Sequence, residues 1–326
     1  MKKKTKIFLV VLLFILATGC TKSLKDGKEV VINPATGQTL TANILCKPDN
    51  IKIVDEKNKL TLYGMYEKHN DKLDVKLEKL PDCNKFTPNK IEYKGLWESI
   101  FIKPLAWIIL KLGNLISNMG LSVMIIGLLI RILMMPIQIK TVKQSENMKK
   151  MQPEMAKIEK KYKNKTDNDS LMAKSQETMM LYKKFNINPV SSCLLAFIQL
   201  PLFFAFLEAI NRVPAIFEDT FLGMNLGMTP GTGIAQQNYI YIILIVLIIG
   251  TTFLSFNNSM KQTADTNNEM AQQTKMMSLF MIFTVSIASF SLPTAIALYW
   301  IVTNGFAVIQ NFIIKKIIDK RNYNEV

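Results

Sequence analysis

One arginine stands inside a long apolar run of the sequence, and its charge is the first feature that could do chemical work. Arg131 interrupts the stretch from Leu121 to Ile139. A guanidinium at the centre of a bilayer costs about 2.5–3.5 kcal/mol on insertion scales, so compensating groups must lie near it. Counted back along a helix from Ile139, Arg131 lies roughly 12 Å from that end of the run. It therefore needs either an acidic partner or water.

Glu208 is the only acidic residue within the apolar runs, and it is a poor partner for Arg131. It follows Ser191 by 17 residues, so a helix would carry it about 25 Å toward the opposite side of the membrane. A hydrated cavity that opens to the cytoplasm, with Arg131 on its wall, is the arrangement that this separation favours. The alternative is that Arg131 snorkels to the nearer headgroups.

Polar residues at comparable depth in the other apolar runs are candidates to line the same cavity. Each alone is weak evidence, because Ser and Thr often bond to their own helix backbone. The predicted groove residues are Arg131, Gln199, Thr252, Ser255, Trp300 and Asn304. A positively charged groove of half the membrane's depth would shorten the apolar distance that a polar segment must cross, and it would attract acidic tails. An apolar segment could then leave it sideways into lipid, which is an insertase mechanism.

The cysteines indicate lipid attachment and a disulfide. Ala17-Thr18-Gly19-Cys20 follows a basic start and an apolar stretch of eleven residues, which is typical of a bacterial lipoprotein signal peptide. We expect cleavage before Cys20 and acylation of its thiol, and an uncleaved signal anchor is the alternative. Cys46 and Cys83 then lie outside the cytoplasm, where disulfides persist. They form either a bridge or two reduced thiols.

Other catalytic and metal-binding motifs do not occur in the sequence. The single His excludes the two-histidine zinc motif HExxH, and the four Cys have no CxxC spacing. Neither GxxxxGK[ST] nor GxGxxG occurs, so nothing in the sequence marks a nucleotide phosphate site. We therefore expect no cofactor, no metal and no enzymatic activity.

The apolar runs predict an all-α polytopic membrane protein with five transmembrane helices around a cytoplasm-open hydrophilic groove. The spans are expected at residues 119–139, 190–211, 238–256, 276–291 and 292–314. A signal peptide at 1–19, an extracytoplasmic segment at 20–98 and an amphipathic helix in the outer interface at 99–118 precede them. The connections are 140–188, 212–237 and 257–275, and a short tail follows at 315–326.

Charge sets the orientation of these spans. The chain carries a net charge of +15, and residues 140–188 contain 12 Lys against 6 acidic residues. Lys and Arg are retained on the cytoplasmic side, so we expect the N-terminus outside, the tail inside, and a location in the bacterial plasma membrane. Because the basic residues flank apolar runs, membrane topology explains them without a nucleic-acid partner.

Residues 141–186 predict a basic, Met-rich helical hairpin in the cytoplasm. Its first helix carries an apolar stripe that steps by three and four residues: Met148, Met151, Met155, Ile158 and Tyr162. The second carries Leu171, Met172, Met179, Tyr182 and Phe185. The stripes form either the seam of the hairpin alone or, in addition, a surface that receives apolar segments, since Met adapts to varied partners.

The extracytoplasmic segment is expected to be a small β domain. Apolar and polar residues alternate at Ile51–Val54, Lys59–Tyr63 and Leu73–Leu77, which predicts short strands. His69 falls in a predicted turn, so we expect it to be solvated.

Four stretches carry a resemblance to a known family. They are Gly120–Pro136, Met148–Glu154 with Lys161-Tyr162, Asn188–Pro201, and Leu292–Gln310. In order and spacing they resemble the YidC/Oxa/Alb family of membrane-protein insertases, over about residues 95–316. The resemblance implies a five-span core, a cytoplasmic hairpin and a groove arginine at Arg131. The lipoprotein signal and short tail resemble the Gram-positive type. The implied partners are nascent membrane proteins and lipid, with the Sec translocon and the ribosome as further candidates.

Two other functions remain as alternatives. A secondary transporter or anion channel could use Arg131 as its substrate site, although the five spans show no inverted repeat. An intramembrane hydrolase would need a Ser/His pair, paired Asp residues or a metal cluster in the spans, and the sequence has none.

Overall fold

The computed structural model describes residues 21–49, 61–91, 93–187, 201–263 and 269–324. The signal peptide, Cys20, Ile51–Val54 and Gln199 therefore lie outside the described residues. The chain divides into two units. The first comprises Met1–Leu128, Leu200–Ile248 and Ser286–Val302, and the second comprises Leu129–Gln199, Ile249–Val285 and Thr303–Val326.

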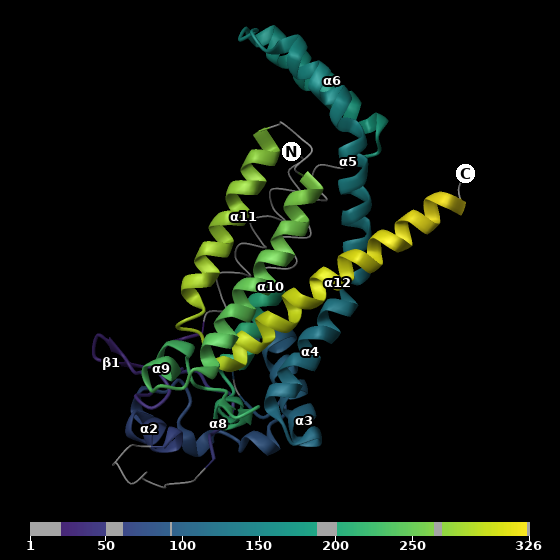
Figure 1. Cartoon of the computed structure of the whole chain (residues 1–326). Helices are drawn as coiled ribbons and strands as arrows, with labels where there is room; N and C mark the ends of the chain where they lie inside the picture. The colour runs from purple at the N-terminus through teal and green to yellow at the C-terminus, as the bar shows by residue number, and fades with distance from the viewer. Residues whose placement is uncertain (1–20, 50–60, 92, 188–200, 264–268, 325–326) are drawn as a thin grey trace. The chain divides into compact units, whose positions relative to one another are not determined.

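Long helices account for most of the described chain, as the apolar periodicity predicts (Figure 1). They are α3 (Lys103–Ile116), α4 (Met119–Leu133), α5 (Met135–Tyr162), α6 (Asn168–Lys184), α10 (Ile240–Thr263), α11 (Glu269–Ala288) and α12 (Thr294–Asn324). The tight turn predicted near Ser291 joins α11 to α12, where the Ser291 N–H donates to the Ala288 carbonyl at 2.9 Å.

By length and composition, three of the described helices could each cross a membrane. These are Glu98–Ile116, Ile240–Asn257 and Thr294–Ile318, and the bent pair α4 and α5 would make a fourth span. Two shorter apolar helices, Pro201–Asn211 and Ser278–Ala288, fall within the predicted spans 190–211 and 276–291. Length alone does not distinguish a helix that crosses the membrane from one that lies in its interface. The five-span arrangement and the interfacial position of residues 99–118 therefore remain predictions.

The predicted span 119–139 is not one straight helix. It breaks at Met134, and α4 and α5 are bent by 53° at that point. Pro136 is the second residue of α5. Its ring has no N–H to donate to the carbonyl four residues earlier, so the helical ladder is interrupted there.

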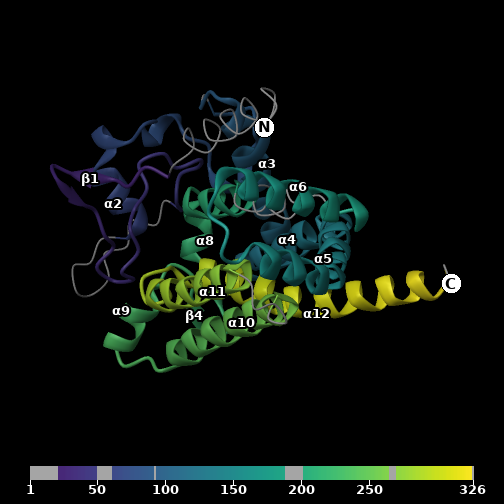
Figure 2. The ribbon, with the colours of Figure 1, turned by 90° about the horizontal axis from the view of Figure 1, so that it is seen from above.

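The segment predicted to be extracytoplasmic, residues 20–98, contains less β structure than expected. Its paired strands are β1 (Lys25–Asp26) and β2 (Glu29–Val30), antiparallel in the register Lys25↔Val30. The segment also contains α2 (Leu62–Lys68) and the 3₁₀ turns Asn70–Lys72, Leu77–Lys79 and Cys83–Lys85. Lys72 of the first turn forms an ion pair with Asp26, so the end of α2 is attached to β1 (Figure 2).

Two of the predicted strands and the predicted exposure of His69 are wrong. Leu62 and Tyr63 begin α2, and Leu73–Leu77 contains no strand. Helical spacing from Leu62 places Met65 and Tyr66 in the core, where both are buried. His69 is 7% exposed and its Nδ1 lies 2.8 Å from the Met65 carbonyl oxygen. Helix burial therefore prevails over a short alternating pattern.

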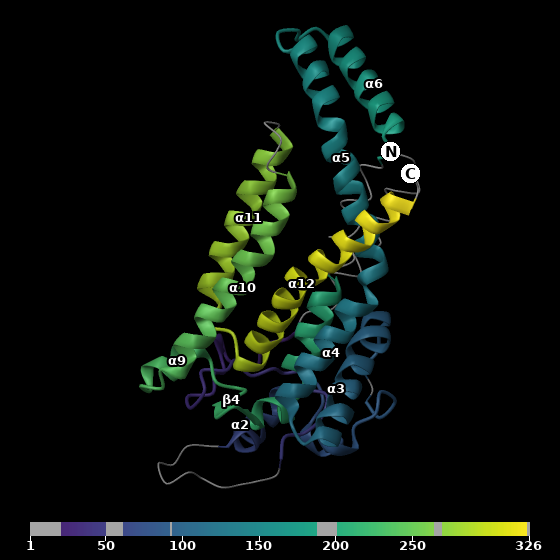
Figure 3. The same cartoon turned by 45° about the vertical axis from the view of Figure 1, so that its right-hand side comes forward.

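In the second unit, α5 and α6 form a helical hairpin, visible as two antiparallel helices in Figure 3. Asp167 caps α6 by accepting the Ser170 N–H at 2.9 Å. The seam is a cluster of apolar side chains from both helices: Met148, Met151, Met155, Ile158, Leu181, Tyr182, Phe185 and Ile187. Leu171, Met172 and Met179 are 51%, 62% and 58% exposed, so these three residues of the predicted stripe lie outside the seam.

Two further helices and a hairpin complete the outer loop. They are α8 (Pro214–Glu218), the antiparallel pair β3 (Thr220–Phe221) and β4 (Met224–Asn225), and α9 (Pro230–Ala235). Thr229 caps α9 through its hydroxyl oxygen.

Candidate functional site: polar groups on the spanning helices

Arg131 lies in the last turn of α4 and is half-buried. Its main-chain carbonyl accepts a hydrogen bond of 3.2 Å from Nε2 of Gln310 on α12. Gln310 is completely buried, and its Oε1 has no hydrogen-bond partner among the described residues. An unpaired buried acceptor costs about 1–3 kcal/mol, so the surroundings of Arg131 favour a polar partner such as water.

The polar residues of α10 approach α12 in the same unit. Thr252 is fully buried and Ser255 is half-buried. A Cβ added at Gly305 of α12 would lie 3.9 Å from Cγ2 of Thr251, which is van der Waals contact. Asn304, beside Gly305, is half-buried. Thus α12 contacts α10 near Gly305 and α4 at Gln310.

Trp300 lies on the part of α12 that belongs to the first unit. Its ring meets Phe203 edge-on at 5.2 Å between centroids, and the neighbouring Tyr299 stacks on Phe206 at 4.2 Å. These rings attach α12 to the helix Pro201–Asn211. Trp300 itself is half-buried. The structure thus places these predicted groove residues on their helices: Arg131, Thr252, Ser255 and Asn304 in the second unit and Trp300 in the first. That they converge on one groove with Gln199 remains a prediction.

Glu208 is fully engaged by partners other than Arg131. The indole Nε1 of Trp97 donates to its Oε2 at 3.0 Å, and Nη1 of Arg212 lies 2.9 Å from its Oε1. Both carboxylate oxygens are therefore accounted for. This agrees with the interpretation that Glu208 is not the partner of Arg131.

Arg212 is the residue that the sequence interpretation missed. It is completely buried, and its Nη1 lies 2.5 Å from Oε1 of Glu98 in addition to the contact with Glu208. Its Nε donates to the Asn43 carbonyl at 2.6 Å, and the Tyr93 ring lies 4.7 Å from its guanidinium carbon. The spacing of four residues between Glu208 and Arg212, which places both on one helix face, could have revealed the pair.

The Arg212 cluster connects three segments that are distant in the sequence. The first segment contains Asn43, the second contains Tyr93 and Glu98, which begins the π-helical turn Glu98–Ile102, and the third is the helix Pro201–Asn211 with Glu208. Desolvation raises the pKa of Tyr93 well above its usual value, and the charge of Arg212 opposes that rise. The cluster is a structural junction, since Arg212 is paired with both Glu98 and Glu208, although Nη2 of Arg212 and Oε2 of Glu98 have no hydrogen-bond partner among the described residues.

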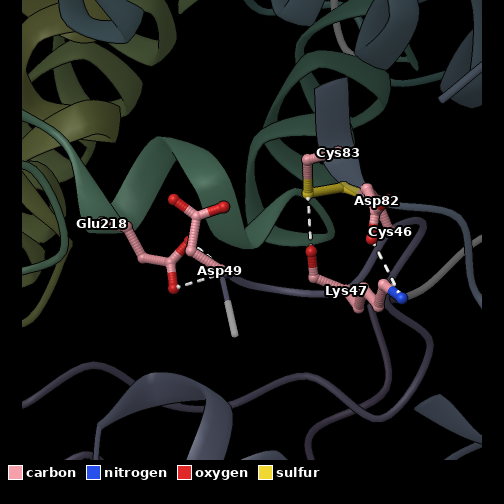
Figure 4. The surroundings of a disulfide bond; sticks show 6 residues. All are labelled: Cys46, Lys47, Asp49, Asp82, Cys83 and Glu218. Atoms are coloured by element: carbon pink, nitrogen blue, oxygen red, sulfur yellow. Dashed lines mark hydrogen bonds and ion pairs between the residues drawn. A yellow bond between two sulfur atoms is a disulfide. The ribbon is translucent and has the colours of Figure 1, made fainter. Parts of the chain in front are cut away.

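A disulfide joins Cys46 to Cys83 in the extracytoplasmic segment (Figure 4). Beside it, Lys47 forms an ion pair with Asp82 at 2.9 Å. The Asp49 N–H lies 3.2 Å from both carboxylate oxygens of Glu218 on α8. Burial raises the pKa of the Glu218 carboxyl to about 7, and the nearby Asp49 carboxylate adds to that rise.

Within the described ranges, no three His, Cys, Asp or Glu side chains gather as a metal site would require. Around Arg131 the structure places the cation itself and the buried amide of Gln310, whose Oε1 has no hydrogen-bond partner among the described residues.

Comparison with known proteins gives consistent matches. The sequence model of the family described as 60Kd inner membrane protein matches residues 111–321. The chain is 37% identical over 222 residues to "Membrane protein insertase YidC 2" of Bacillus anthracis, covering 68% of this chain and 82% of that protein. It is 35% identical over 237 residues to "Membrane protein insertase YidC" of Oceanobacillus iheyensis, covering 71% and 86%. It is 34% identical over 220 residues to "Membrane protein insertase MisCA" of Bacillus subtilis, covering 67% and 79%.

Proposed function

The chain belongs to the 60Kd inner membrane protein family, the YidC/Oxa/Alb insertases, and on that premise we propose that it inserts nascent membrane proteins into the bacterial plasma membrane. It moves their short hydrophilic tails through a positively charged groove and releases their transmembrane segments into lipid. It also acts on these clients as a chaperone. No covalent step is involved.

The observation that carries this proposal is the environment of Arg131. Its side chain is half-buried on α4 while its carbonyl is held by the buried Gln310 of α12. A cation in that position attracts acidic residues at the front of a client tail. The unpaired Oε1 of Gln310 favours a hydrated path beside it. A path that is hydrated over half of the membrane's thickness shortens the apolar distance that the tail must cross.

The remaining site residues have supporting roles in the same path. Ser255 on α10, with Trp300 and Asn304 on α12, is half-buried and offers hydrogen bonds to a passing tail. Thr252 is fully buried and is proposed to support the wall of the path, and Gln199 is proposed to line it. The exposed methionines of α6, Met172, Met179 and Met180, receive apolar client segments at the cytoplasmic side. The seam of the hairpin leaves these side chains accessible.

The proposed topology places the acylated Cys20 outside and the tail, 315–326, in the cytoplasm. Five spans cross the membrane, and residues 99–118 lie in its outer interface. Nascent membrane proteins and lipid are the partners, and the Sec translocon and the ribosome are further candidates. The relatives reported above are named as insertases, and nothing in the comparisons favours the transporter or channel alternative.

The test uses the purified protein in liposomes with a single-span client that carries an acidic translocated tail. Protection of the tail from added protease measures insertion. We expect Arg131→Lys to keep most of the protection, and Arg131→Ala and Arg131→Glu to lower it about tenfold, the factor that corresponds to about 1.4 kcal/mol. A charge acting through water needs no bidentate geometry, which explains the tolerance of Lys.

Lys157→Ala is the matched control, because Lys157 is an exposed cation on α5 away from the spans. It should leave tail protection unchanged. Equal protection by wild type and Arg131→Ala would remove Arg131 from the mechanism while retaining the insertase. No protection of several clients by the wild-type protein would overturn the proposed function.

A further inference from the structure

In the hairpin of β3 and β4, the residue types of the turn do not suit its backbone angles. Phe221 pairs with Met224, so Leu222 and Gly223 form a two-residue loop. Their φ angles are +50° and +78°. A turn with positive φ at both positions favours Asn-Gly, because only Gly, Asn and Asp adopt the left-handed region at little cost. Leu222 is a poor residue for this position on local grounds.

Packing against the described residues does not explain Leu222 either. Its side chain is 75% exposed, so the strained backbone places an apolar group outside the protein. A single exposed leucine is ordinary. A leucine that is exposed and also has an unfavourable backbone angle at the tip of a hairpin is unusual, since Asn would suit both the angle and contact with water.

The hairpin is held against the beginning of α4 by three contacts. The Met119 N–H donates to Oδ2 of Asp219 at 2.6 Å, and Nδ2 of Asn118 lies 3.4 Å from the Thr220 carbonyl. A Cβ at Gly120 would lie only 2.9 Å from Cβ of Phe221, so that glycine permits the close approach. The carboxylate of Asp219 also complements the positive end of the α4 dipole. The tip therefore has a fixed position at the outer end of α4.

Apolar side chains continue from this position along neighbouring helices. Leu121 and Ile125 of α4 are 40% and 37% exposed, and Leu115 near the end of α3 is 80% exposed. When α4 crosses the membrane, these side chains face lipid. Phe221, next to Leu222 in the sequence, lies against Gly120 in the first turn of α4, so the hairpin tip is near the same end of this helix.

We propose that Leu222 inserts into the outer leaflet, so that the hairpin β3–β4 is a lipid-contacting anchor for the outer end of α4. The occupant of this surface is the acyl-chain and glycerol region of the lipid. The proposal requires that α4 spans the membrane, and it does not depend on the groove or on insertion of any client. Lipid contact compensates for the strain that the turn carries in water.

The first experiment measures depth directly. Leu222→Trp is reconstituted in liposomes that contain lipids brominated on the upper acyl chain, and the quenching gained over the parent protein is recorded. The matched control is Lys28→Trp, which places the ring in the exposed turn of the polar hairpin β1–β2. We expect quenching at position 222 at least threefold greater than at position 28. Equal quenching at both positions would overturn the proposal.

The second experiment distinguishes turn geometry from lipid contact, because the two change the rate of hydrogen exchange in opposite directions. Leu222→Asn suits the backbone angle, so turn chemistry alone predicts slower hydrogen exchange of the amides in residues 220–225. If lipid holds the tip, the same variant in liposomes should make those amides exchange at least threefold faster. Slower exchange would contradict the proposal, and neither measurement depends on insertase activity.

Discussion

At the scale of single residues, two arginines show two ways to keep a guanidinium out of bulk water. Arg212 is completely buried and is neutralised by Glu98 and Glu208. Arg131 is half-buried, and the buried group beside it is an amide. A buried guanidinium held by two carboxylates suits a structural junction, whereas a half-buried cation suits the proposed attraction of acidic client tails.

The prediction at this scale concerns Arg212. Arg212→Met removes the cation and leaves the buried Glu208 and the half-buried Glu98 without it, which should destabilise the first unit by about 3–5 kcal/mol. Faster proteolysis of the extracytoplasmic segment and a lower unfolding temperature would show this. The triple variant that adds Glu98→Gln and Glu208→Gln should recover much of the loss. An unchanged unfolding temperature for Arg212→Met would mean that the cluster contributes nothing to stability.

At the scale of elements, a few local features mark where the helices bend and where they contact one another. Pro136 bends the chain between α4 and α5, so the span that carries Arg131 ends close to it. Near Gly305, α12 approaches Thr251 of α10, and Gln310 attaches α12 to α4. Thus α12 is the element that joins the two polar helices of the second unit.

The hairpin of α5 and α6 gives a prediction with an internal control. Met151 is 3% exposed in the seam, whereas Met179 is 58% exposed. Met151→Ala should destabilise the hairpin by about 2–5 kcal/mol, because it opens a cavity. Met179→Ala should change its stability by less than about 0.5 kcal/mol. Hydrogen exchange of the amides in α5 and α6 measures both, and equal protection in the two variants would show that the seam is not where the packing places it.

At the scale of the whole molecule, residues 21–98 are connected to the rest of the first unit at several points. Arg212 reaches Asn43, Glu218 accepts the Asp49 N–H, and the disulfide between Cys46 and Cys83 closes a loop with a sequence separation of 37. The family match begins at residue 111. The segment is thus an addition outside the matched region that is fastened by its own covalent and ionic contacts.

Loss of the disulfide is the prediction that belongs to this scale. In the chain-entropy model a loop of this length contributes about 4 kcal/mol. Cys46→Ser with Cys83→Ser should therefore speed proteolytic cleavage between positions 46 and 83 severalfold, with cleavage of the α5–α6 hairpin unchanged. Mass spectrometry of the fragments measures both, and Cys193→Ser is the cysteine control. Unchanged cleavage would indicate that the ionic contacts suffice to hold the segment.

The sequence by itself determined the helical class, the hairpin, the isolation of Arg131 from Glu208 and the family. Each depends on spacing along the chain, such as apolar residues every three or four positions or the count of residues between two charges. Such patterns are local, so they can be read without knowing what packs against them.

Only the tertiary structure decided the burial of Arg212, the contact of Gln310 with Arg131, the helix α2 and the enclosure of His69. Arg212 and Glu98 are separated by 114 residues, and Gln310 and Arg131 by 179. Whether such groups meet depends on how helices pack. The free energy of burying a short segment such as α2 likewise comes from neighbours distant in the sequence, and it exceeds the small difference between local helix and strand preferences.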